Sequence, residues 1–545
     1  MNRKIIYFIL FIAVVASASI AFTIQYDIYS YHIWAYTAIK EGVSQIYDME
    51  KYFDRVCDYT PVGAYLSIFQ GKVLSYFAPL KIGSVPMLFF YKLLPALFIF
   101  FLFYKIMFKT GKRQALFAFL LRAPFAVSTV LNGQFDIIIV FLLLMGINQM
   151  EKQNQKTGIS ILMLALYVKQ TAIFFVVLIF LHYFIQSNDR KKIALNTALF
   201  FFLGFTAVFL PFIIKWNLFE AIKDMVKNTL YSSPFSGYAF NMLSLIKNSK
   251  YIDFNYNVMD LSFLTYSILT VLASIALIAL KRDWDIMKKI SLFSIIWFNF
   301  LVGLREQHIL YPFFFLSIFL FYSKKNIILN IILFFLSILN FILYNPIIAL
   351  AVFKEPSLPE SMLLAFTLFQ IIFSTFIFIM ILKEREHTRK QNAEISFTRK
   401  ESLRTAGILI FIILAAQFFP GFYEREEKEF LSDAIEIKDV IEISKDRYID
   451  LNVVTLNSFE NYLGVRLSDN AYFKVKNSGK YQEIVFDAVS EFTDNASLIV
   501  NSDTLTIERH MKNIKVKFNI GDTLTIKALT GKKYSQIAVC NFRYR

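Results

Sequence analysis

Residues 5–48 decide the fold: twenty apolar residues, IIYFILFIAVVASASIAFTI (5–24), lead directly into QYDIYSYHIWAYTAIKEGVSQIYD (25–48). An apolar helix of that length can cross the hydrocarbon core of a bilayer. Asp27 then stands where the chain leaves the hydrocarbon, a position that is costly for a charge and typical of functional sites in membrane proteins. After Asp27, apolar and aromatic residues recur at helical spacing, which predicts a helix lying in the membrane interface.

The composition excludes a soluble globular protein. Of the 545 residues, 57% are hydrophobic, 17% are aromatic and only 18% are charged, which is far more apolar than the average soluble domain. The formal net charge of +16 could point to nucleic acid, but Lys and Arg fall in short clusters between apolar segments, as cytoplasmic loops require. Only two cysteines are present, Cys57 and Cys540, so one bridge is conceivable but a disulfide framework is excluded.

Apolar runs with basic flanks predict a polytopic all-α membrane protein with roughly 11 to 13 transmembrane helices. The expected spans are 5–24, 83–105, 114–131, 135–150, 158–168, 171–186, 194–215, 260–280, 289–304, 308–323, 327–352, 362–382 and 404–420.

The basic clusters predict which side of the membrane each loop faces. With the N-terminus inside, a cluster follows in every second gap, as the orientation rule demands. The stretches predicted on the outer face are therefore a large first loop (25–82), the turn 132–136, the loop 216–259 and the turn 305–308. Residues 158–186 leave two alternatives open, a pair of short helices flanking Lys169 or one long span, and the downstream charges favour the pair.

The tail changes character after Pro420. A charged connector at 424–447 leads into short alternating runs broken by Asn, Asp and Gly from about residue 448 onward. Residues 1–423 are thus predicted to form the transmembrane domain and residues 448–545 an extracytoplasmic all-β domain of the sandwich type. That domain could bind a glycan or could simply pack on the outer loops.

Polar residues recur at the predicted outer ends of the spans, and their chemistry is complementary. They are Asp27, Asp58 in CDYTP, Asp136 in NGQFD, Lys169 in YVKQT, and Arg305, Glu306 and His308 in LREQHILYP. A carboxylate can deprotonate an attacking hydroxyl, and cations can stabilise a departing phosphate. This collection therefore suits group transfer from a phosphorylated lipid.

In these segments the chain resembles the GT-C superfamily of membrane glycosyltransferases, most closely the prokaryotic proteins related to the second GPI mannosyltransferase. The resemblance covers about the first 320 residues as an ordered set of short motifs. It rests on Asp27 with Trp34-Ala35 and 42–47, on Asp58 to Pro61, on Gly133 to Asp136, on Lys169-Gln170 and on Arg305 to Pro312. Thr60 and the segment 305–308 depart from the family pattern, which usually has a second proline and a His-Glu-Arg-Tyr segment.

The resemblance implies an inverting glycosyltransferase in the plasma membrane. It would move mannose, or another hexose or pentose, from a polyprenyl-phosphate donor to a glycan, lipid or protein acceptor on the outer face. Asp27 would be the catalytic base, and no cofactor would be required. Arg305, His308 and Lys169 would bind the donor phosphate, while Asp58, Asp136 and Glu306 would bind substrate or supply an acid. A divalent metal held by Asp27, Asp58 and Asp136 is a further alternative.

Each candidate also has a purely structural interpretation. Asp27 could mark a helix end that faces water, and Asp136 could be the N-cap of the fourth span. Arg305 and His308 could pair with Glu306 or reach lipid headgroups. Lys169 could pair with a carboxylate across the helix bundle.

Two further cations, Lys92 and Arg122, fall inside predicted spans and should face the bundle interior, where they would serve packing or contact the donor lipid.

The competing function is a transporter or flippase for a lipid-linked saccharide. It predicts an internal repeat with interrupted helices in both halves, and no such repeat is evident in the sequence. A receptor-like protein, in which the tail would be the active part, is a third possibility.

Overall fold

The computed structural model describes most of the chain, with gaps between the described segments. These are residues 3–21, 26–47, 57, 59–77, 85–107, 133–232, 258–301, 306–322, 329, 331–337, 360–383, 397–421, 440–443, 449–457, 460–468, 470–476, 483–491, 496–507, 510–517, 522–529 and 536–544.

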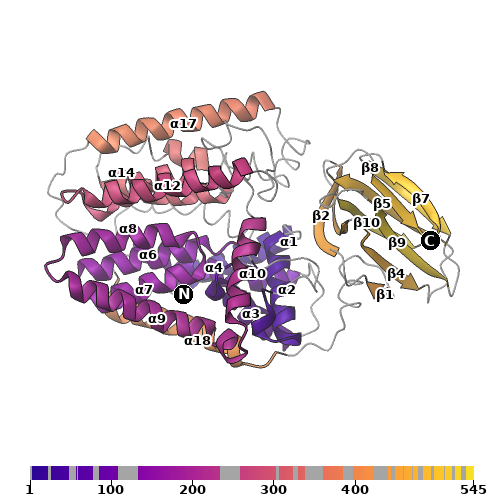
Figure 1. The fold of residues 1–545 in the computed structure, drawn as a ribbon, viewed down its shortest axis with the longest axis horizontal. Helices are drawn as coiled ribbons and strands as arrows, with labels where there is room; N and C mark the ends of the chain where they lie inside the picture. Colours follow the sequence, from indigo (N-terminus) through magenta and orange to yellow (C-terminus); the bar gives the residue numbers. More distant parts are fainter. Residues whose placement is uncertain are drawn as a thin grey trace. The chain divides into compact units, whose positions relative to one another are not determined.

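The transmembrane region is helical, as the apolar runs predict (Figure 1). Its helices are α1 (Arg3–Ala21), α2 (Tyr26–Lys40), α3 (Pro61–Ser75), α4 (Val85–Met107), α6 (Asp136–Glu151), α7 (Gln155–Val168), α8 (Ala172–Gln186), α9 (Arg190–Ile214), α10 (Leu218–Ser232), α12 (Val258–Leu280), α13 (Ile286–Phe300), α14 (Leu310–Tyr322), α17 (Glu360–Lys383) and α18 (Arg399–Phe418). Short 3₁₀ helices are η1 (Val43–Gln45) and η3 (Glu306–Ile309). The predicted span 114–131 and most of 327–352 lie outside the described residues.

In the part of the chain that the structure describes, three helices are long and apolar enough to cross a membrane: Arg190–Ile214, Leu364–Lys383 and Arg399–Phe418. Only 17%, 22% and 39% of their most apolar windows are buried within the protein. Large apolar side chains such as Leu195 and Phe202 are about two-thirds exposed. A helix that is apolar and yet exposed is suited to lipid rather than to water, so the chain is a membrane protein.

Helices α7 and α8 form the antiparallel pair, not one long span. Lys169, between them, contacts Asp136 at the start of α6, while Tyr183 near the end of α8 donates a hydrogen bond to the carbonyl of Ile147 near the end of α6. Helix α8 therefore runs alongside α6 in the same direction, and α7 runs back between them in sequence. Figure 1 shows these helices lying side by side with α9.

Contacts at the far end of α6 gather the segments predicted to face inward. The backbone of Phe397, just before α18, accepts hydrogen bonds from Gln149 and Lys152 and donates one to Asn148. Gln186, at the end of α8, donates to the carbonyl of Arg282 in the loop before α13. The ends of α6 and α8 thus meet these two segments, and the side of the membrane on which they lie stays a prediction.

The chain divides into two compact units, and residues 12–57, 67–92 and 416–545 form the second of them. In this unit α2 is buried on all faces between Ser30 and Ala38. Helix α2 is therefore packed within the protein on all sides over this stretch, and its place in the membrane interface stays a prediction.

Within the same unit, α3 holds the chain where it leaves α18. The Lys72 ammonium donates to the carbonyls of Ala416 and Phe419, both at 2.8 Å, and Tyr76 donates to the carbonyl of Pro420 at 2.7 Å. A cation on the last carbonyls of a helix satisfies groups that have no partner in the helix itself. The first loop and the exit of the last span therefore lie together.

The tail is β-structure, as the alternating runs predict. Its strands are β1 (Val440–Ile443), β2 (Ile449–Asn457), β3 (Glu460–Ser468), β4 (Tyr472–Lys476), β5 (Glu483–Glu491), β6 (Ala496–Val500), β7 (Asp503–Ile507), β8 (His510–Lys517), β9 (Thr523–Leu529) and β10 (Gln536–Tyr544). Strand β1 falls in the segment predicted as a connector, and β3 was not among the predicted runs.

The strands form two five-stranded antiparallel sheets, in the orders β1-β4-β9-β6-β7 and β2-β3-β10-β5-β8. Contacts of β3 with β9 and of β5 with β7 join the sheets face to face. Without the added strands β1 and β2, this order is that of a jelly roll. The final strand, β10, is a central one, paired with β3 on one side and β5 on the other.

A glycine at the start of α3 permits close approach to α7. A Cβ built on Gly63 would lie 2.2 Å from the carbonyl oxygen of Val168, whereas one built on Gly407 in α18 would meet nothing within 4 Å. We therefore expect Gly63→Ala to destabilise the protein by roughly 1–3 kcal/mol, because the helices must separate.

The matched variant Gly407→Ala should leave stability unchanged or raise it by up to about 1 kcal/mol, since Ala favours the helix. Thermal unfolding of both variants in detergent measures the difference. Equal melting temperatures would show that Gly63 is not a packing constraint.

Candidate functional site

The candidate site is a buried ion pair between Asp136 and Lys169. The ammonium lies 3.2 Å from one carboxylate oxygen and 3.3 Å from the other, and Tyr311 donates its hydroxyl to the carboxylate at 2.8 Å. Asp136 is 1% exposed and Lys169 5%. The structure thus brings together three segments far apart in the sequence, at the ends of α6, α7 and α14.

Local sequence explains how the two charged side chains reach this place. Gly133 adopts a φ of +65°, in the left-handed region that favours glycine, and the turn it makes delivers Asp136 as the first residue of α6. Lys169 ends α7 in an extended conformation, with φ −157° and ψ 141°, so it projects from the junction between two helices.

The N-cap interpretation of Asp136 is wrong. Phe135 occupies the cap position of α6 and no side chain caps the helix there. The carboxylate is directed instead to Lys169 and Tyr311. The alternative in which Lys169 pairs with a carboxylate across the bundle is confirmed.

Aromatic rings enclose the ion pair. The Lys169 ammonium lies 4.9 Å from the centre of the Tyr59 ring, and Tyr59 donates a long hydrogen bond of 3.4 Å to Gln134. On the other side, the Tyr311 ring stacks on Phe175 at 5.5 Å and meets the edge of Trp297 at 5.2 Å. These contacts exclude water and so strengthen every charge interaction inside them.

His308 belongs to the same cluster. Its side chain is 4% exposed, and its ring lies 5.8 Å from Trp297 and 6.4 Å from Tyr311. It also interacts electrostatically with the Asp136 carboxylate. Three of the residues expected to contact substrate, namely Asp136, Lys169 and His308, are therefore neighbours.

The other predicted site residues are only partly described. Asp27 lies in α2 and Glu306 in η3 by their backbones, and their side chains are outside the described part of the structure. Asp58, Arg305 and Arg122 lie wholly outside it. Lys92 is 0% exposed, as predicted for a cation inside a span, and Cys57 is also buried.

Helix α2, which carries Asp27, presents a second buried polar group. His32 is 3% exposed, and its Nδ1 lies 3.3 Å from the Tyr91 hydroxyl and its ring 5.9 Å from that of Tyr91. Burial lowers the pKa of His32 from 6.5 to about 4. The imidazole is therefore neutral at physiological pH and supports α2 as a packed element.

The metal alternative finds no support among the described side chains, where no group of three His, Cys, Asp or Glu residues converges. Asp136, the described member of the proposed set, already engages Lys169 and Tyr311 with its carboxylate. The carboxylates of Asp27 and Asp58 are outside the described residues.

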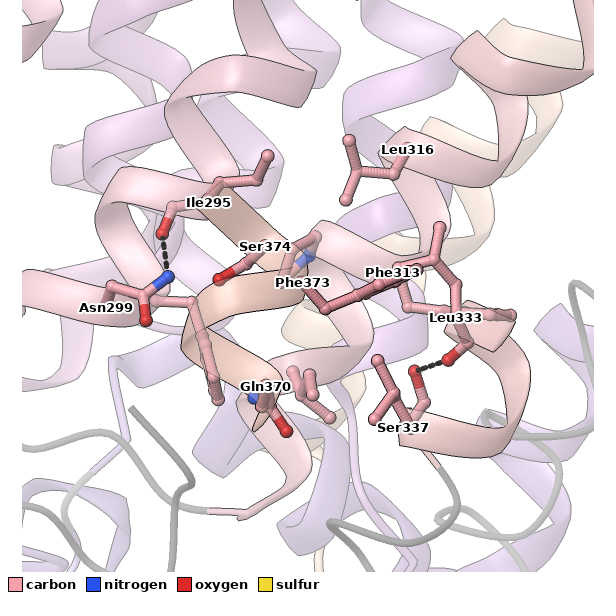
Figure 2. A pocket seen from close by; sticks show the side chains of 13 residues that line it. Ile295, Asn299, Phe313, Leu316, Leu333, Ser337, Gln370, Phe373 and Ser374 are labelled. Carbon is pink, nitrogen blue, oxygen red and sulfur yellow. Dashed lines mark hydrogen bonds between the residues drawn. The ribbon is translucent and has the colours of Figure 1, made fainter. Parts of the chain in front are cut away.

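A separate pocket lies between α13, α14, α17 and residues 333–337 (Figure 2). It is lined by apolar side chains and by a few amides and hydroxyls. In Figure 2 the Asn299 amide donates to the carbonyl of Ile295, and the Ser337 hydroxyl to that of Leu333. Since no titratable residue lines this pocket, the ion-pair cluster is the stronger candidate site.

Comparison with known proteins leaves the family open. No protein-family model matches the chain, and no curated protein matches it. Among solved structures, the chain is similar to the arabinosyltransferase EmbB from Mycobacterium smegmatis, determined by single-particle cryo-EM, with 8% identity and a TM-score of 0.24. The match covers 98% of this chain and 64% of EmbB, and a likeness of that size carries no argument about fold or activity.

The two tyrosines at the ion pair allow a matched test. Tyr311→Phe removes the donor to a buried carboxylate, so we expect a loss of roughly 1.5–3 kcal/mol of stability. Tyr59→Phe keeps the ring under Lys169 and removes the hydroxyl that makes the long hydrogen bond to Gln134, so its cost should stay below about 1 kcal/mol. Thermal unfolding in detergent compares the two, and an equal loss would mean that the Tyr311 hydroxyl does not stabilise the charge.

His32 predicts a pH dependence of stability. In the unfolded chain His32 becomes protonated below about pH 6.5, whereas in the folded chain it stays neutral until about pH 4. The free energy of unfolding therefore falls as the pH drops from 6.5 to 4. At 1.36 kcal/mol per pKa unit the full loss is roughly 3 kcal/mol.

We expect His32→Gln to show a smaller drop in melting temperature than the wild type between pH 6.5 and pH 4.5. Since both proteins share every other titrating group, parallel pH profiles would contradict the assignment.

Proposed function

We propose that the chain is a GT-C-like glycosyltransferase that moves a sugar from a polyprenyl-phosphate donor to an acceptor at the outer face of the membrane. The observation that carries the proposal is the buried cluster of Asp136, Lys169, Tyr311 and His308, set at one end of a bundle of apolar helices. Ionisable groups in such a place are costly and mark functional sites. Their position coincides with the motifs on which the family resemblance rests.

The reaction assigns separate roles to carboxylate and cations. Asp27 takes the proton of the acceptor hydroxyl as its oxygen attacks the anomeric carbon. The bond from that carbon to the phosphate oxygen breaks, and polyprenyl phosphate leaves from the opposite face, so the configuration inverts. Lys169, His308 and Arg305 stabilise the negative charge that develops on the phosphate. Asp58 and Glu306 are assigned to substrate binding.

The sugar is proposed to be a hexose such as mannose, or a pentose, as the family resemblance implies. The acceptor is a glycan, lipid or protein. Membrane lipid is the other partner, and the reaction needs no cofactor, since the donor already carries a leaving group.

Asp27→Asn tests the base. In membranes supplied with a polyprenyl-phosphate sugar, we expect turnover to fall by at least about 100-fold, the usual scale of general-base catalysis. Binding of the donor should change little. The matched control is Asp283→Asn, an exposed residue in a loop predicted on the inner face, which should retain full turnover.

Two outcomes would overturn the proposal. If Asp27→Asn turns over normally, Asp27 is not the base. If the wild type never consumes any polyprenyl-phosphate sugar but carries a lipid-linked saccharide across proteoliposome membranes, the protein is a flippase instead.

A further inference from the structure

The ion pair in the candidate site is loose on the side of Lys169. Its two ammonium-to-carboxylate distances, 3.2 and 3.3 Å, exceed the 2.7–2.9 Å or so of a strong charge-assisted hydrogen bond. Lys169 also stands in the extended junction after α7, and its four-carbon side chain is not fixed by a helix. The ammonium is therefore joined to the two helices by a flexible side chain at their junction.

The carboxylate would not be stranded if Lys169 moved. Asp136 keeps the Tyr311 hydroxyl at 2.8 Å, its shortest bond in the cluster, and it stays within electrostatic reach of His308. The usual penalty for leaving a buried charge alone is thereby reduced. The cluster is built so that Asp136 tolerates the loss of one partner.

A neighbouring side chain, Trp297, carries a buried N–H donor. Trp297 is 0% exposed, and in the described part of the chain its indole Nε1 finds no acceptor. An unsatisfied buried N–H of this kind costs roughly 1–3 kcal/mol and calls for an acceptor. Trp297 contacts the ring of Tyr311, and the Tyr311 hydroxyl donates to Asp136, which in turn pairs with Lys169. Among the described residues, Trp297 thus adds a buried donor without an acceptor to the cluster.

We propose that Asp136 holds Lys169 in place of a phosphate, and that an incoming lipid phosphate takes the Lys169 ammonium from Asp136 and accepts the Trp297 N–H. A phosphate offers more charge and more acceptor oxygens than a carboxylate, so it competes for both donors at once. Trp297 is then a phosphate-binding residue and Asp136 a competitor that keeps Lys169 in position until the donor arrives. The inference rests on the proposed function for the identity of the lipid.

Binding of sugar-free polyprenyl phosphate to the full-length protein in nanodiscs tests this exchange. Asp136→Asn removes the competitor, so we expect binding about tenfold tighter. Lys169→Met should weaken binding at least about tenfold and abolish the effect of Asp136→Asn. Trp297→Phe, which keeps a ring and loses the N–H, should weaken binding by about two- to tenfold. Trp284→Phe is the matched control. Trp284 lies in a loop predicted on the inner face, and its ring contacts Lys288 of α13.

A folded Asp136→Asn variant that binds no tighter than the wild type overturns the exchange. If that variant does not fold, Tyr311→Phe provides the test. This variant removes the hydroxyl that donates to Asp136, so the ion pair between Asp136 and Lys169 should become stronger. Polyprenyl phosphate should then bind several-fold more weakly than to the wild type. Unchanged binding by Tyr311→Phe would then overturn the proposal.

Competition by inorganic phosphate identifies the source of the anion. If the site is specific for the lipid, millimolar inorganic phosphate should not reduce the binding of polyprenyl phosphate. If inorganic phosphate blocks that binding, the site is one for free phosphate and the lipid assignment is overturned. The probe carries no sugar, so the result is independent of turnover. A protein that shows the exchange but never transfers sugar would refute only the proposed function.

Discussion

A charge buried among apolar helices must be met by another charge, and the pairing of Asp136 with Lys169 is how this chain meets that demand. An unpaired carboxylate at this depth would cost several kcal/mol, so the start of α6 and the junction of α7 and α8 are bound to lie together. Tyr311 adds the start of α14 to the same point. The helix ends that the pair brings together define the site.

Much of the architecture was predictable because hydropathy and charge report directly on membrane crossing. Apolar runs predict the helices, and the contacts of Lys169 and Phe397 lie at opposite ends of α6. The burial of α2 was harder to predict, since aromatic residues such as Trp34 suit both an interface and a core. Strand β3, ENYLGVRLS, was missed because Asn461 and Gly464 resemble turn signals.

The site was predictable in its members more than in its geometry. The sequence suggests a carboxylate partner for Lys169 as one interpretation, but Asp136 lies 33 positions away and only the antiparallel course of α6 and α7 makes them neighbours. Tyr311 and Trp297 were missed, since an aromatic residue in an apolar span is usually packing. The available signal was their polar atom: a buried Tyr or Trp usually needs a hydrogen-bond partner.

The place of β10 in the tail constrains how the protein is made. Strand β10 is inserted between β3 and β5, so that sheet cannot close before residues 536–544 are available for pairing. Strands β3 and β5 therefore lack the strand that joins them until β10 has been made. Until then β3 and β5 expose unpaired edges, and the tail depends on folding quickly, or on a protecting partner, to avoid aggregation.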